Sequence, residues 1–158
     1  MATQVKAPVR SKRDHDYERD IYAWSKAQTD LLRARPFNEV DLEHLIEEIE
    51  EVGGSLGRSA RNRTITIIEH LLKVQHAPAT DRRAGWRQTV RTQRVQLRRA
   101  LTPTLGRELE AELPDLYADG RDLTAGALAD RGEAEAALVP PGTCPYDLDR
   151  IIGNWMPD

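Results

Sequence analysis

A chain of 158 residues with 39% hydrophobic side chains and a net charge of −3 can bury the core of one globular domain. No stretch approaches the roughly 20 apolar residues that a membrane-spanning helix needs, which excludes that class of protein. The single cysteine, Cys144, excludes an internal disulfide, and it fits a cytoplasmic location.

The first 13 residues carry four bases and Pro8 with only isolated apolar side chains, which is typical of a disordered basic tail. No apolar run follows the bases, so we expect no secretory signal. Side chains then recur at spacings of three and four, which predicts a helix from about Asp16 to Arg33, ended by Pro36. We expect residues 14–158 to form a single helical domain.

The next helix is predicted to begin near Asp41, a good N-cap residue. Its apolar residues recur at helical spacing and form one apolar stripe, made of Leu42, Leu45, Ile46, Ile49 and Val52. Residues 39–51 also carry seven acids and no base, and the acids occupy the rest of the helix surface. Gly53-Gly54 is expected to end this helix, because glycine reaches the left-handed C-cap conformation at little cost.

Ser55 or Ser59 can cap a third helix that runs to about Gln75. Its second half has apolar residues on two sides, so we expect a central, mostly buried helix. The β-branched run 64–68 could form a strand by propensity alone, but the helical spacing continues through Val74 and favours a helix.

A fourth helix is predicted at about Ala84–Leu101. Residues 82–99 carry seven arginines and no acid, and four of them recur at helical spacing as an arginine stripe, made of Arg87, Arg91, Arg94 and Arg98. Residues 58–107 have a net charge of +10, whereas the segments before and after them have −4 and −9. Nearby acids would repel a polyanion, so we expect much of the arginine stripe to pair with acids of the same chain.

Thr102-Pro103 is a cap followed by a residue suited to the first helical position, and it predicts a fifth helix. Pro114 is expected to divide that helix into pieces near 104–112 and 115–130. Pro140-Pro141-Gly142 marks a loop before a last short helix at about 147–153. The sequence therefore predicts an all-α fold, a single-domain bundle of five to seven helices with the third one central.

Several short motifs stand in a specific order between about Tyr17 and Pro157. They are Tyr22-Ala23-Trp24, Asp41-Leu42-Glu43-His44-Leu45-Ile46-Glu47-Glu48-Ile49-Glu50, His70-Leu71-Leu72-Lys73, Trp86-Arg87-Gln88-Thr89-Val90 with Gln93-Arg94, and Cys144-Pro145-Tyr146. In this order the chain resembles a bacterial family, domain-of-unknown-function family 29. The family pattern has Asn at His44, Trp at Val74 and Gln-Pro at Ala77-Pro78. The resemblance implies an all-helical domain and no established activity.

Metal binding is the first hypothesis for an enzyme. A helical bundle can hold two metals with carboxylate-x-x-His pairs from two helices and further carboxylates. Asp41 and His44 form one such pair, but the residues three positions before His70 and His76 are not carboxylates. Asp41, His44 and His70 are therefore weak metal candidates, and we expect no metal and no other cofactor.

A nucleophile is a weaker hypothesis still. Cys144 precedes Pro145 and has no predictable basic partner, so we interpret it as a packed small side chain. The run Gly53-Gly54-Ser55-Leu56-Gly57 lacks the Lys-Ser/Thr signature of a phosphate loop, and we interpret it as a turn between helices. We expect no catalytic residue.

Two binding hypotheses stay open. Guanidinium forks suit phosphate oxygens, so the arginine stripe could contact nucleic acid or an acidic partner, although few aromatic residues accompany it. The apolar stripe of the acidic helix must be covered by this chain, by another copy in a homo-oligomer or by another protein. We favour a small cytoplasmic domain, more a binding protein than an enzyme, that binds another protein or itself. Nucleic-acid binding is the alternative, a metal-dependent enzyme using His44 and His70 comes third, and we expect no membrane contact.

Overall fold

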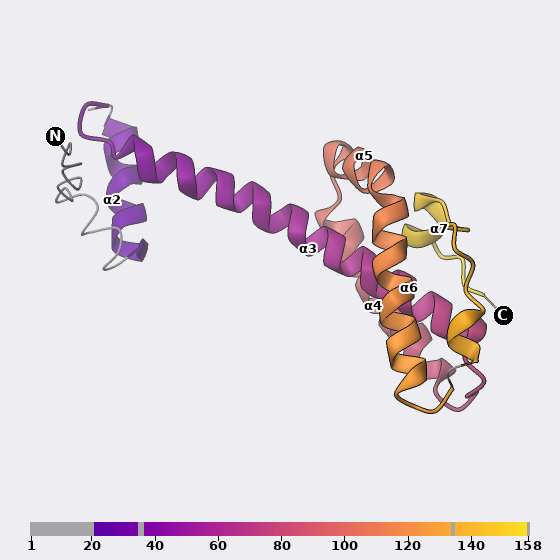
Figure 1. The fold of residues 1–158 in the computed structure, drawn as a ribbon. Coiled ribbons are helices and arrows are strands. Elements are labelled where there is room, and N and C mark those ends of the chain that lie inside the picture. Colours follow the sequence, from indigo (N-terminus) through magenta and orange to yellow (C-terminus); the bar gives the residue numbers. More distant parts are fainter. Residues whose placement is uncertain (1–20, 35–36, 134, 158) are drawn as a thin grey trace, which may run out of the picture. The chain divides into compact units, whose positions relative to one another are not determined.

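The structure is a computed structural model that describes residues 21–34, 37–133 and 135–157. These residues form six α-helices, one 3-10 helix and no strand, so the predicted all-α class is confirmed. The elements in Figure 1 are α2 (Ile21–Ala34), α3 (Leu42–His76), α4 (Arg83–Ala100), α5 (Pro103–Ala111), α6 (Leu113–Ala129), η1 (Ala136–Leu138) and α7 (Leu148–Ile152). None of the described helices combines the length and the apolar character that crossing a membrane requires. The expected tail at 1–13 and the start of the first predicted helix lie outside the described residues.

The chain divides into two compact units, residues 1–54 and residues 55–158. In the first unit, the buried side chain of Gln28 on α2 accepts a hydrogen bond of 2.8 Å from the backbone N–H of Asp41. Asp41 directly precedes α3, as the capping pattern predicted. This bond therefore ties α2 to the first turn of α3. A single domain over residues 14–158 stays a prediction.

The α3 helix continues through Gly53-Gly54, so the helix end predicted there is wrong. Inside a helix a glycine costs about 1 kcal/mol relative to alanine, but it adopts helical dihedral angles without strain. Among the described glycines, only Gly132 has a positive φ, so neither glycine of this pair adopts the left-handed C-cap conformation. The pair does coincide with a boundary, because the first unit ends at Gly54.

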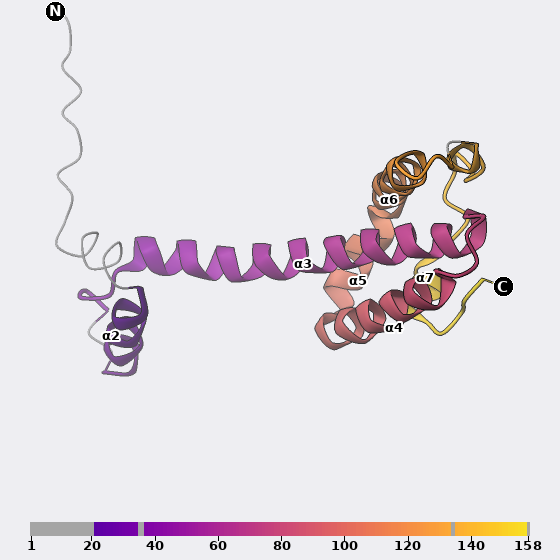
Figure 2. The same ribbon diagram turned by 90° about the horizontal axis from the view of Figure 1, so that it is seen from below.

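The second half of α3 is the centre of the second unit, as the two-sided apolar pattern predicted. Its residues Ile67, Ile68, Leu71 and Leu72 are fully buried. They share one core with side chains of α4, α5, α6 and α7, among them Val90, Leu97, Leu109, Leu116 and Ile151. Figure 2 shows α4 running beside this half of α3, and Figure 1 shows α6 crossing it.

The helix starts predicted at Thr102-Pro103 and near residue 147 are confirmed, whereas the start predicted at Ser55 or Ser59 is wrong, because α3 is continuous there. The Thr102 hydroxyl accepts a hydrogen bond of 3.2 Å from the backbone N–H of Leu105, and Pro103 begins α5. The Asp147 carboxylate accepts one of 2.8 Å from the backbone N–H of Arg150 and caps α7. The predicted helix at 84–101 corresponds to α4, and the break near Pro114 corresponds to the boundary between α5 and α6.

The packing of α6 on α3 depends on Gly120. A Cβ atom added at this position would lie 2.7 Å from Cγ2 and 3.0 Å from Cβ of the buried Ile68. It would also lie 3.3 Å from the backbone oxygen of Ile65. The two helices therefore approach each other more closely than any residue larger than glycine permits.

We expect Gly120→Ala to lower the free energy of unfolding by about 1–3 kcal/mol, because the added methyl group overpacks the contact with Ile68. Gly126 is the matched control, since it lies on the same helix and a methyl group added there would have nothing within 4 Å. Gly126→Ala should raise stability by about 1 kcal/mol through helix propensity. Urea unfolding followed by circular dichroism measures both variants. Equal effects at the two positions would contradict the close approach.

Candidate functional site

The arginine stripe of α4 donates to backbone carbonyls of the C-terminal segment. The Arg94 side chain is buried, with 3% of the residue exposed. Its Nε donates to the carbonyl oxygen of Ile151 at 2.7 Å, and its Nη2 donates to that of Arg150 at 2.6 Å. A single guanidinium therefore bridges two successive carbonyls of α7.

Two further members of the stripe extend this contact. Arg98 donates from Nη1 to the carbonyl oxygen of Ile152 at 2.8 Å, and Arg87 donates from Nη2 to that of Pro157 at 3.1 Å. The carbonyls of residues 150–152 lie at the C-terminal end of α7, where a helix leaves its own carbonyls without partners. Cations also stabilise the negative end of a helix dipole. Arg94 and Arg98 thus cap α7.

The expectation that much of this stripe pairs with acids of the same chain is not met among the described residues. Within the described part of the chain, none of its four arginines lies within ion-pair distance of a carboxylate. The carboxylate of Glu112, between α5 and α6, accepts a hydrogen bond of 2.7 Å from Arg61 on α3, which lowers the pKa of that carboxyl group. A backbone carbonyl carries only a partial charge, so the guanidinium groups of α4 keep their net positive charge.

Three of these arginines line one cleft. The arginine cleft has a volume of about 280 Å³ and is lined by Arg91, Arg94, Val95, Arg98, Asn154 and Met156. Burial, reinforced by the charge of Arg98, lowers the pKa of Arg94 to about 10. Arg94 is still protonated at neutral pH, so the cleft is positively charged.

The metal candidates are divided between the two units. In the first unit, Nδ1 of His44 lies 2.9 Å from Oδ2 of Asp41, one helical turn away. His70 belongs to the second unit, where its Nδ1 lies 2.9 Å from the backbone oxygen of Thr66. No cluster of three or more His, Cys, Asp or Glu side chains with metal-binding geometry occurs among the described residues.

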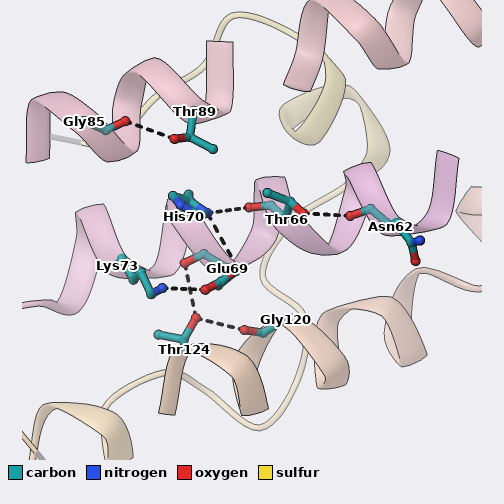
Figure 3. Close-up of polar contacts among 9 residues, drawn as sticks. All are labelled: Asn62, Thr66, Glu69, His70, Lys73, Gly85, Thr89, Gly120 and Thr124. Carbon is teal, nitrogen blue, oxygen red and sulfur yellow. Dashed lines mark hydrogen bonds and ion pairs between the residues drawn. The ribbon is translucent and has the colours of Figure 1, made fainter. Parts of the chain in front are cut away.

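His70 instead belongs to a polar cluster on α3, drawn in Figure 3. Glu69 lies between His70 and Lys73 there; it forms an ion pair with the buried Lys73 and lies 3.7 Å from Nδ1 of His70. The Thr124 hydroxyl of α6 donates to the backbone oxygen of Gly120 at 2.8 Å and lies 3.2 Å from that of Glu69. Burial is the main reason that the pKa of His70 is lowered. This cluster fastens α6 to α3, and it resembles a structural contact more than a catalytic one.

Cys144 is half-buried, and its thiol lies 3.3 Å from the carbonyl oxygen of Tyr146. Burial raises the pKa of the thiol, which keeps it protonated and weakens it as a nucleophile. The geometry therefore agrees with a packed side chain.

A polar groove between α3 and α4 was missed by the sequence reasoning. It has a volume of about 470 Å³ and is lined by Ser55, Arg58, Ser59, Asn62, Arg63, Thr66 and Gln93. Arg63 donates to Oε1 of Gln93 at 2.9 Å across it. The hydroxyl and amide residues of α3 recur at helical spacing, a signal that could have indicated a polar face toward α4. Asn154 and Met156 of the arginine cleft have no such signal, because only tertiary packing brings them to α4.

The apolar stripe of the acidic helix is exposed on α3. Four of its five residues keep more than half of their surface accessible: Leu42 (55%), Ile46 (55%), Ile49 (64%) and Val52 (61%). Only Leu45 is half-buried. Of the covers that the sequence leaves open, a cover by this chain is not supplied by the described residues.

We expect Arg94→Lys to lower the free energy of unfolding by about 2 kcal/mol, because a lysine ammonium cannot bridge two carbonyls and leaves one without a donor. Arg91→Lys on the same helix is the matched control. Arg91 is exposed and has no hydrogen bond with any described residue, so its replacement should leave stability unchanged. Thermal and urea unfolding measure both. Equal stability of the two variants would contradict a capping role for Arg94.

The lowered pKa of His70 predicts acid sensitivity. A histidine whose pKa in the folded state lies below its ordinary value of 6.5 stabilises the fold above pH 6.5, and this contribution is lost as pH falls through the folded-state pKa. Stability should therefore fall from pH 7 to pH 5, and less steeply in His70→Asn, whose amide can still donate to Thr66. Melting temperatures at several pH values measure the slope. A parallel slope in wild type and variant would exclude His70 as its source.

One comparison with known proteins found a match. The pattern of a family described as Domain of unknown function DUF29 matches residues 17–156, which is most of the chain. Searches of curated proteins and of solved structures found no match. The chain therefore belongs to the domain family of unknown function DUF29.

Proposed function

We propose that this chain is a docking domain whose apolar stripe on α3 binds a basic amphipathic helix of another protein. The observation that carries the proposal is the exposure of four large aliphatic side chains along one face of an acidic helix. No basic residue occurs between positions 39 and 51. The face is thus apolar in its centre and negative at its edges.

Exposed aliphatic side chains of this number provide a driving force for association. Burying a large aliphatic side chain fully contributes about 1.5–3 kcal/mol, so each residue that is already about half-covered can contribute about 1 kcal/mol. A soluble helix normally turns such a stripe toward a core. Contiguous exposed apolar surface rimmed by polar residues is typical of an interaction site.

The charge at the edges favours a basic partner over a second copy. Helical steps of about 100° place Glu43 and Glu50 along one edge of the stripe and Glu48 along the other. Pairing two copies stripe to stripe would bring these carboxylates together, and the repulsion would oppose the apolar contact. A partner helix with lysine or arginine at its edges gains from the same carboxylates.

We expect a synthetic helical peptide of about 20 residues, with leucines at helical spacing and lysines elsewhere, to bind the full chain. The double variant Ile46→Gln/Ile49→Gln should weaken binding at least about tenfold, because two apolar contacts are lost. Fluorescence anisotropy of the labelled peptide measures the dissociation constant. Binding should also weaken as salt rises, since the edge charges are screened.

Leu123→Gln is the matched control, because Leu123 is a similarly exposed aliphatic residue (53%) on α6 and should leave peptide binding unchanged. A peptide with glutamate in place of lysine should not bind. Equal affinity of the double variant and wild type would contradict the proposed surface. Light scattering could instead detect a dimer of the wild type that is absent in the double variant. That result would show that a second copy of the chain, and not a basic helix, covers the apolar stripe.

A further inference from the structure

We propose that the arginine cleft is a binding site for a phosphate group, either free phosphate or the phosphate of a small ester. It lies between α4 and the C-terminal segment, in the second unit, and is separate from the apolar stripe. The apolar stripe presents aliphatic side chains with carboxylates beside them, whereas the cleft presents cations and hydrogen-bond donors.

The first argument is uncompensated charge. Arg91, Arg94 and Arg98 line a volume of about 280 Å³, and none of them forms an ion pair with a described carboxylate. Arg94 is a buried cation whose nearest partners are neutral carbonyls. Three like charges around one cleft repel each other, and a bound dianion would turn that repulsion into attraction.

The second argument is preorganisation. The hydrogen bonds to α7 fix the guanidinium groups of Arg94 and Arg98, so little side-chain entropy is left to lose on binding. Among the described residues, neither Nη1 of Arg94 nor the side chain of Arg91 has a protein partner. The side-chain amide of Asn154 can add a further donor. Guanidinium forks match the oxygens of a phosphate group.

The third argument concerns the size and walls of the cleft. Its volume lies near the lower end of the range for small-molecule sites, which runs from about 300 to 1,000 Å³. Val95 and Met156 add an apolar wall that suits the carbon part of a small ester. A nucleic-acid strand requires a track of free cations and aromatic side chains for its bases, but no aromatic side chain lines the cleft, and two of its arginines are held by α7.

Isothermal titration of the full chain with inorganic phosphate and with phenyl phosphate, at constant ionic strength set by chloride, tests the site. We expect saturable binding with one phosphate per chain. Arg91→Gln should weaken it at least about tenfold, since one charge-assisted contact is lost, and Arg91→Glu should abolish it. Arg99→Gln is the matched control, because Arg99 is exposed on the same helix outside the cleft and should leave the affinity unchanged.

The two phosphate probes distinguish the source of the group. Tighter binding of phenyl phosphate indicates a small ester, and equal binding indicates free phosphate. Absence of saturable binding to either probe, or equal affinity in Arg91→Gln and wild type, would overturn the proposal. Binding of a 20-nucleotide single strand without binding of either probe would assign the arginines to nucleic acid instead. Unchanged melting temperatures of the Arg91 variants exclude misfolding as the cause of any loss.

Discussion

A buried guanidinium group holds the C-terminal segment of this protein in place. Removing a charged group from water costs free energy unless hydrogen bonds replace the water. Arg94 meets this requirement with the last carbonyls of α7, which themselves need donors. Each side therefore satisfies the other, and Ile151 of α7 is fixed in the same core as Leu97 of α4. Because α7 is only five residues long, it would not be stable as an isolated helix, and this contact helps to keep it helical.

The choice of carbonyls instead of carboxylates has an electrostatic consequence. A carboxylate would have cancelled the charge of an arginine, whereas a carbonyl satisfies its hydrogen bonds and leaves the charge. The molecule as a whole carries −3, yet the field around Arg91, Arg94 and Arg98 is positive. The net charge of a chain therefore says little about the sign of any one surface.

Local signals in the sequence predicted local structure well. The Thr102 cap and the two-sided apolar pattern of the central helix act within one or two turns, and both are confirmed. The helix end predicted at Gly53-Gly54 is wrong. Each glycine lowers helix stability by about 1 kcal/mol, which is small beside the stabilisation from the hydrogen bonds of a continuing helix. Helical spacing also identified the residues of each stripe. It could not identify their partners, which depend on where residues 148–157 and the other helices pack.

The two proposed surfaces use different physics and lie in different compact units. The apolar stripe, within residues 42–52, would bind through apolar area with charge at the edges, whereas the arginine cleft would bind through charge-assisted hydrogen bonds. A ligand at one surface changes affinity at the other only if it favours one of two states that differ at both. No contact described here supplies such a shared state. The simplest expectation is therefore that the free energies of binding at the stripe and at the cleft add, and that each partner is recognised by one unit alone.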